Sequence, residues 1–155
     1  MSNLCKKILV PIDGSDQAKK AFEEAVHFAL TQNSELTILT VVADYLRYDF
    51  GELNLRSKYQ NSTAYEELLR QYQLFAQQAG VKEVSLKIKQ GDPRKEILNV
   101  AKEEKSDLII MGSTGKGMID RLLIGSVSEF IMNHSSCDVL ITLSLIHISE
   151  PTRPY

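Results

Sequence analysis

The sequence is poor in several features by which whole classes of protein are recognised. It has only two cysteines in 155 residues, Cys5 and Cys137, with no Cys-x-x-Cys spacing. We therefore expect free thiols in a reducing compartment rather than a disulfide or a metal site. No apolar run reaches the ~18 residues that a membrane-spanning helix requires. Lys6 and Lys7 stand where a signal-peptide core would begin, so we expect a cytoplasmic protein with no membrane partner.

The chain also lacks an excess of charge of either sign. It has 18 Lys and Arg against 20 Asp and Glu, a net charge of −2, and no basic block. Because binding to a phosphate backbone needs clustered Lys and Arg, we expect no nucleic-acid partner. With 43% hydrophobic and 25% charged residues, the composition is that of an ordinary globular protein. The length suits one domain with a buried core.

The chain does contain a regular alternation of strand and helix signals. Stretches with apolar residues at helical spacing separate five short runs, of which four are apolar and one, residues 84–89, alternates apolar and polar residues. These runs predict strands at residues 7–12, 36–42, 84–89, 108–111 and 139–141. The alternation predicts an α/β fold in which helices cover both faces of a parallel sheet through right-handed crossovers.

Local signals place the beginnings of the helices. Ser15 and Asp92 are expected N-caps, and Ser/Thr-x-x-Glu capping boxes starting at Thr63 and Ser126 predict two further helix starts. The stretch 43–61 has no clean period, so we interpret it as a long loop with at most a short helix. Its aromatic residues leave two roles open, a flap over a ligand or a surface for a partner.

Residues 111–127 carry most of the information about function. The fourth predicted strand ends in Gly112, Gly115 follows three residues later, and Gly125 with Ser126 leads into the next helix. Glycine allows a backbone to bend and to approach a ligand closely. The N–H groups of such a turn, together with a helix N-terminus, bind phosphate well. The sequence therefore predicts an anion-binding loop.

The same loop offers little for catalysis. It is not a Walker A motif, because Lys116 is followed by Gly117 and no Gly-Lys-Ser/Thr occurs. Lys116 and Arg121 either neutralise phosphate charge or face solvent. Hydrolysis would want a base or a metal cluster near the terminal phosphate, and only Asp13 and Asp120 are candidates. We therefore expect binding with little or no turnover, and we assign no catalytic residue.

The first and fourth predicted strands are expected to share one crevice. Ligands of doubly wound sheets bind beyond the carboxyl ends of the strands, where the strand order reverses. If these two strands are neighbours there, residues 11–15 face the glycine-rich loop. Asp13 is then either a ligand contact or a turn residue beside Gly14, and we favour the ligand contact.

These motifs together resemble one known family. The spacing Gly112-x-x-Gly115, nine residues and Gly125-Ser126 resembles the ATP-binding signature of the universal stress proteins. Residues 8–15 resemble the opening strand and turn of that family, and residues 125–141 resemble its closing helix and strand. The resemblance covers residues 5–142. It departs at Asp138, where the family commonly has proline, and this position leaves the ATP site untouched.

The resemblance implies a Rossmann-like, three-layer α/β/α domain with five parallel strands in the order 3-2-1-4-5. It also implies a homodimer, built through the fifth strand, that binds ATP with Mg²⁺ or Mn²⁺. The implied function is nucleotide-dependent regulation of the stress response together with an unidentified protein partner. Two alternatives stay open, a slow ATPase or nucleotide hydrolase and a nucleotide-free dimeric scaffold.

The resemblance also implies a set of contact residues. Around the adenosine it places Pro11, Asp13 and Val41, and Asp13 is the candidate contact for the metal ion that accompanies ATP. Around the phosphates it places Gly112, Ser113, Gly115, Lys116, Gly125, Ser126 and Val127.

The end of the chain is a separate matter. Residues 143–155 resemble a translated sequencing-library adapter. Pro151 and Pro154 disfavour regular structure there. We therefore expect a universal stress protein domain at residues 1–142 followed by a non-native tail, and we give His147 no role.

Overall fold

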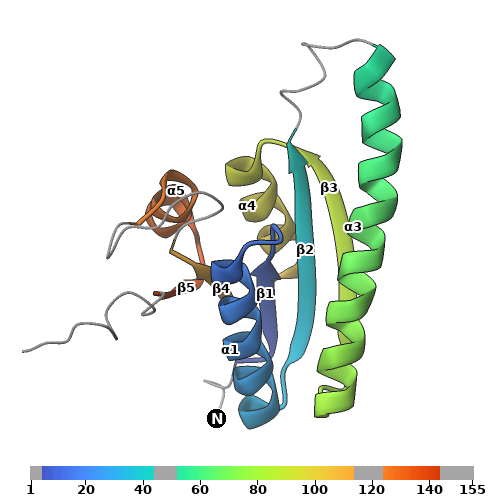
Figure 1. The fold of residues 1–155 in the computed structure, drawn as a ribbon. Helices are drawn as coiled ribbons and strands as arrows, with labels where there is room; N and C mark the ends of the chain where they lie inside the picture. Colours follow the sequence, from blue (N-terminus) through green and yellow to red (C-terminus); the bar gives the residue numbers. More distant parts are fainter. Residues whose placement is uncertain (1–4, 44–51, 114–123, 144–155) are drawn as a thin grey trace, which may run out of the picture.

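The computed structural model describes residues 5–43, 52–113 and 124–143, which form a parallel sheet between two layers of helices (Figure 1). The elements in chain order are β1 (Lys7–Pro11), α1 (Asp16–Gln32), β2 (Glu35–Ala43), α3 (Glu52–Ala79), β3 (Val84–Gly91), α4 (Pro93–Glu104), β4 (Leu108–Gly112), α5 (Ser126–His134) and β5 (Asp138–Thr142). The five strands lie in the order β3-β2-β1-β4-β5. This order confirms the predicted three-layer fold and its topology.

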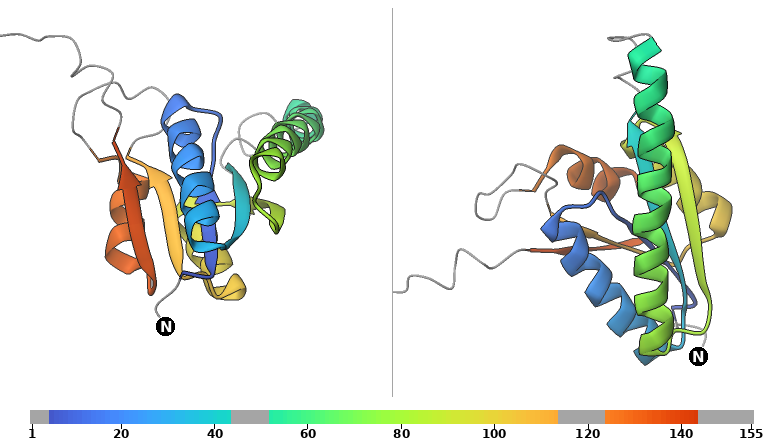
Figure 2. Two further views of the ribbon diagram at one scale, coloured as in Figure 1. Left: turned by 90° about the horizontal axis from the view of Figure 1, so that it is seen from below. Right: turned by 45° about the vertical axis from the view of Figure 1, so that its right-hand side comes forward.

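Each face of the sheet has its own hydrophobic cluster. Helices α1 and α3 cover one face, and α4 and α5 cover the other (Figure 2). Ile8 and Val10 belong to the first cluster, whereas Leu9 between them belongs to the second. Because successive side chains of a strand point to opposite faces, a central strand must be apolar at every position. This requirement explains the uninterrupted apolar runs of β1 and β4.

The sheet order reverses beside β1. This strand is in register with β2 as far as Pro11↔Leu39, but its register with β4 runs only over Ile8↔Leu108 and Leu9↔Ile109. After β1 the chain crosses to α1 on one face, and the chain after β4 leads to α5 on the other. The carboxyl ends of β1 and β4 therefore border the crevice in which ligands of such sheets bind.

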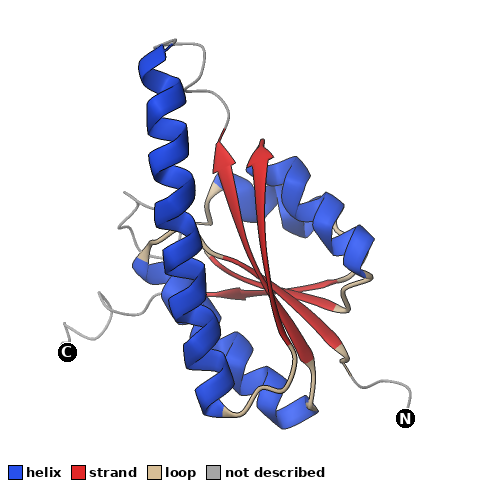
Figure 3. Ribbon diagram, turned by 90° about the vertical axis from the view of Figure 1, so that its right-hand side faces the viewer, coloured by secondary structure: helices blue, strands red, loops and turns tan. Residues whose placement is uncertain are grey.

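Helix α3 differs from the sequence prediction. It is one helix of 28 residues, so the predicted start at Thr63 is wrong and part of the predicted loop 43–61 is helical. No glycine or proline occurs between Glu52 and Ala79, so no residue with a strongly unfavourable helix propensity interrupts this stretch. At 1.5 Å per residue α3 is about 42 Å long, whereas the eight residues of β3 span about 26 Å. Its N-terminal part therefore extends past the sheet, where it needs no apolar stripe (Figure 3). Among the described helices, α3 included, none carries an apolar stretch sufficient to cross a membrane.

The predicted capping box at the start of α5 is also wrong. Gly125 is the N-cap, with extended backbone angles and no side-chain hydrogen bond to the helix. Ser126 is already the first helical residue, and the N–H of Glu129 donates to the carbonyl oxygen of Gly125 at 2.9 Å. The hydroxyl of Ser126 is therefore not the cap of this helix. The other two predicted caps, Ser15 on α1 and Asp92 on α4, are confirmed.

Gly112, the last residue of β4, lies directly against the backbone of α1. A Cβ atom at this position would stand 2.9 Å from the carbonyl oxygen of Gln17 and 3.0 Å from its carbonyl carbon. Real Cβ atoms do not approach backbone atoms so closely. The sequence interpretation gave this glycine to the ligand, and the structure shows that it also lets α1 pack against the end of β4.

Replacing Gly112 by alanine should lower the free energy of unfolding by about 1–3 kcal/mol, as overpacking does elsewhere, because a backbone segment must move. Urea unfolding followed by circular dichroism measures the change. Gly14→Asn is the control for backbone strain without a clash, because Gly14 has a φ of +85°, which asparagine adopts more readily than most residues, and no atom within 4 Å of a Cβ; it should cost less than Gly112→Ala. An unchanged midpoint for Gly112→Ala would contradict the close packing of α1 on β4.

Candidate functional site

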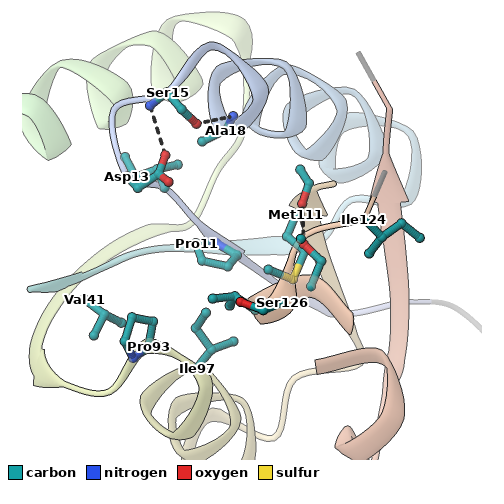
Figure 4. A pocket seen from close by; sticks show the side chains of 15 residues that line it. Pro11, Asp13, Ser15, Ala18, Val41, Pro93, Ile97, Met111, Ile124 and Ser126 are labelled. Atoms are coloured by element: carbon teal, nitrogen blue, oxygen red, sulfur yellow. Dashed lines mark hydrogen bonds between the residues drawn. The ribbon is translucent and has the colours of Figure 1, made fainter. Parts of the chain in front are cut away.

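A cavity of about 500 Å³ opens at the carboxyl ends of β1, β2 and β4 (Figure 4). It lies where the strand order reverses, and the first turns of α1, α4 and α5 complete its walls. The described residues that line it are Pro11, Ile12, Asp13, Ser15, Ala18, Val41, Pro93, Ile97, Met111, Gly112, Ile124, Gly125, Ser126, Val127 and Ser128.

One end of the cavity is polar and belongs to the turn between β1 and α1. Asp13 is exposed, and its Oδ1 accepts a hydrogen bond from the N–H of Ser15 at 2.9 Å. Ser15 in turn caps α1, because its Oγ accepts from the N–H of Ala18 at 3.1 Å. No described residue forms a hydrogen bond with Asp13 Oδ2. The carboxylate can therefore accept a hydroxyl group of a ligand or contact a cation.

The opposite wall is apolar and combines the end of β2 with the start of α4. Val41, Pro93 and Ile97 lie together there (Figure 4). Pro93 opens α4, whose N-terminus is capped by Asp92 through a 3.0 Å hydrogen bond from the N–H of Arg94. Hydrogen bonds from the Arg94 side chain to Asp92 also lower the pKa of this carboxyl. The N-terminus of α4 is therefore already satisfied by the chain itself.

The N-terminus of α5 is different, because no side chain caps it. The first N–H groups of a helix have no carbonyl partner within the helix, and they carry the positive end of the helix dipole. Gly125, Ser126 and Val127 bring this end of α5 to the cavity. Of the three helix N-termini that border the cavity, the α5 N-terminus is the one without a side-chain cap, which favours an anion there.

Hydrogen bonds at the end of β4 hold this N-terminus in place. Ser128 Oγ donates to the carbonyl oxygen of Gly112 at 2.7 Å. The N–H of Gly125 donates to the carbonyl oxygen of Ser113 at 2.6 Å, and the N–H of Ser113 donates to that of Thr142 in β5 at 3.0 Å. The two ends of the glycine-rich segment are therefore joined to each other and to the edge strand.

Comparison with known proteins places the chain in a family. Residues 5–142 match the model of the Universal stress protein family. The chain belongs to the universal stress protein family. A Staphylococcus epidermidis protein that carries this family name is 37% identical over 139 residues, which are 88% of this chain and 82% of that protein.

Solved structures agree with this membership. Universal stress protein UspA from Lactobacillus plantarum superposes with a TM-score of 0.79 at 31% identity, over 88% of this chain and 96% of that one. A universal stress protein crystallised in complex with cAMP superposes with a TM-score of 0.69 at 27% identity, over 91% of this chain and 98% of that one.

Most residues implied by the universal stress protein signature come together in the cavity. Those that line it are Pro11, Asp13, Val41, Gly112, Gly125, Ser126 and Val127. Ser113 is buried and is not part of the lining; its backbone instead joins β5 to the start of α5. Gly115 and Lys116 lie outside the described residues, as do Asp120 and Arg121.

The sequence interpretation missed the contribution of α4. Pro93 and Ile97 form much of the apolar wall, although only the N-cap at Asp92 was predicted for this helix. A signal was present, because α4 starts directly after the carboxyl end of β3, and the carboxyl ends of parallel strands share one edge of the sheet. Ser128 was missed too, and no local pattern marks it.

Among the described residues that line the cavity, Asp13 is the one carboxylate. Within residues 5–43, 52–113 and 124–143, no three His, Cys, Asp or Glu side chains lie close enough together to hold a metal ion. A divalent ion at Asp13 would therefore need further ligands, which the phosphates of a nucleotide can supply.

Proposed function

We propose that this universal stress protein binds ATP, with Mg²⁺ or Mn²⁺, in the cavity at the carboxyl ends of β1, β2 and β4. One observation carries the proposal: the uncapped N-terminus of α5 and the Asp13 carboxylate line the same cavity of about 500 Å³. The relative in complex with cAMP supports an adenine nucleotide as the ligand class. The bound nucleotide would act as a regulatory signal rather than as a rapidly consumed substrate.

The base is expected on the apolar wall. The N–H of Ile12 donates to the carbonyl oxygen of Leu39 at 2.8 Å, which directs Leu39 toward β1. The backbone N–H and C=O groups of a strand point to alternate sides from one residue to the next. Val41 lies two residues after Leu39, so its N–H and C=O also face the β1 side, beyond the end of β1 at Pro11. Adenine presents an amino donor beside a ring-nitrogen acceptor, and the backbone of Val41 offers the complementary pair. Pro93 adds apolar contact area for the ring.

The ribose and the phosphates then extend toward the polar end of the cavity. The Asp13 carboxylate suits the ribose hydroxyls, as an acidic residue does in other dinucleotide-binding sheets. The phosphates suit the α5 N-terminus, where free N–H groups and the helix dipole act together. A divalent ion would bridge the phosphates and Asp13. Gly115 and Lys116 remain predicted phosphate contacts.

Replacing Ser126 by aspartate should separate binding from stability. A carboxylate at the first helical position favours the helix dipole, so the melting temperature should stay the same or rise. The same carboxylate repels phosphate, and we expect ATP binding to weaken by about tenfold or more, an effect of about 1.4 kcal/mol. Isothermal titration calorimetry with Mg²⁺ or Mn²⁺ and a thermal melt measure the two effects.

Ser136→Asp is the matched control, because it makes the same charge change at an exposed serine away from the cavity. Ser136 lies just before β5, at the amino ends of the strands. It should bind ATP like the wild type. The proposal is lost if the wild-type protein shows no saturable ATP binding, or if Ser126→Asp and Ser136→Asp bind ATP equally well.

Turnover is expected to be slow or absent, because Asp13, the one carboxylate among the described lining residues, is better placed for the ribose than for an attacking water. Phosphate release measured under multiple-turnover conditions should stay near the level of a protein-free blank. Release well above that level, abolished by Asp13→Asn, would instead favour the alternative of a slow ATPase.

We also propose a homodimer through β5, because the two edges of the sheet differ in charge. The edge strand β3 carries Lys87 and Lys89, whose ammonium groups lie 3.1 Å and 3.9 Å from carboxylate oxygens of α4. The other edge strand, β5, has one charged residue, Asp138 at its start, and then presents Val139, Leu140 and Ile141 without a charge. Charged side chains protect an edge from pairing with another chain, and an uncharged edge invites it.

Replacing Val139 by lysine should shift the protein toward monomer in sedimentation velocity, because lysine is a natural guard of edge strands. Val84→Lys is the matched control. Both valines are partly buried in edge strands and contact a core cluster, but Val84 lies on β3. A monomeric wild type, or equal dissociation by both variants, would contradict a dimer through β5.

A further inference from the structure

One peptide group at the end of β4 connects three elements of the fold. Its N–H, that of Ser113, donates to the carbonyl oxygen of Thr142 in β5 at 3.0 Å. Its carbonyl oxygen, that of Gly112, accepts the hydrogen bond from Ser128 Oγ in α5 at 2.7 Å. A trans peptide points its N–H and its C=O in opposite directions. The carbonyl of Gly112 therefore points away from β5, toward the crevice between β4 and β1.

Ser128 is one of two buried residues in the nine-residue helix α5, and the other is Ile131. Its exposed fraction is 3%. A serine inside a helix commonly bonds a carbonyl of its own helix. Ser128 instead donates to a strand residue 16 positions earlier. Helix α5 is therefore held by a polar contact in its first turn and by an apolar contact one turn later.

This hydrogen bond has two consequences for the cavity. It sets the direction of the first turn of α5, and with it the direction of the N–H groups of Ser126 and Val127. It also covers the carbonyl oxygen of Gly112, whose partial negative charge would otherwise face the crevice. Both effects favour an anion at the α5 N-terminus.

We propose that Ser128 is a positioning residue for the phosphate of the bound nucleotide. It acts through the Gly112 carbonyl and the α5 N-terminus, since its hydroxyl proton is already donated to Gly112. Its role differs from that of Ser126, which is exposed at the start of the helix and free to contact the ligand. This inference rests on the proposed nucleotide site and adds a residue to it.

Adenosine and AMP test this role, because they differ only in the phosphate. The wild-type protein should bind AMP more tightly than adenosine in isothermal titration calorimetry. Ser128→Ala should reduce this preference by about tenfold, the value of about one hydrogen bond to a charged group, while adenosine affinity changes less than about twofold. Ser128→Thr keeps the hydroxyl and should restore the preference.

Ser34 offers a matched control. Its exposed fraction is 5%, and its Oγ donates to the carbonyl oxygen of Cys5 at 2.6 Å, so it makes the same kind of buried bond. It lies just before β2, at the amino ends of the strands, whereas the cavity lies at their carboxyl ends. Ser34→Ala should lower the melting temperature to a similar extent and leave the preference for AMP unchanged.

Several outcomes would overturn the inference. If Ser128→Ala weakens the binding of adenosine and of AMP equally, Ser128 has a purely structural role. If the preference for AMP is unchanged, Ser128 has no role in positioning the phosphate. A wild-type protein that binds adenosine and AMP equally would reject the proposed phosphate site itself, and the positioning role with it. If Ser128→Ala does not fold, Ser128→Cys decides through the same ratio, because a thiol of similar shape is a weaker donor.

Discussion

The structure of the site depends on the peptide group between Gly112 and Ser113. Its two polar atoms bind α5 and β5, and the missing side chain of Gly112 lets α1 approach to backbone contact. Helix α1, which is distant in the sequence, and the consecutive elements α5 and β5 thus meet at the last residue of one strand. In a parallel sheet with two helical layers, the carboxyl ends of the strands lie together at the ligand crevice. One peptide group at such a strand end can therefore influence the geometry of the cavity.

The three helix N-termini around the cavity differ in their caps. Ser15 and Asp92 cap α1 and α4, and each side chain accepts one backbone N–H of the first turn, which stabilises these helices. Gly125 leaves α5 without such a cap. The open N-terminus costs the isolated helix some stability and gives the cavity a site for negative charge. We interpret this difference as the reason for a glycine at the start of α5.

The sequence predicted best where the cause is local. The caps at Ser15 and Asp92, and the alternation of β1 and β4 with helices, depend on neighbouring residues and on burial of both sheet faces. The prediction for α3 failed, because a missing apolar period was read as a missing helix, although the N-terminal part of α3 lies beyond the sheet and needs no such period. The predicted capping box at Ser126 is wrong for another reason. The Ser-x-x-Glu pattern does not show at which residue the helical backbone angles begin, and the helix begins at Ser126 itself.

By itself, the sequence determined the fold class, the strand order through its family signature, and seven of the fifteen described residues that line the cavity. These follow from patterns along the chain, because hydrophobic period and glycine spacing encode elements and turns. Only the tertiary structure decided the apolar wall from α4, the packing of Gln17 on Gly112 and the bond from Ser128 to Gly112. Such contacts join distant segments, and a serine or a glycine carries no local sign of the partner that folding brings to it.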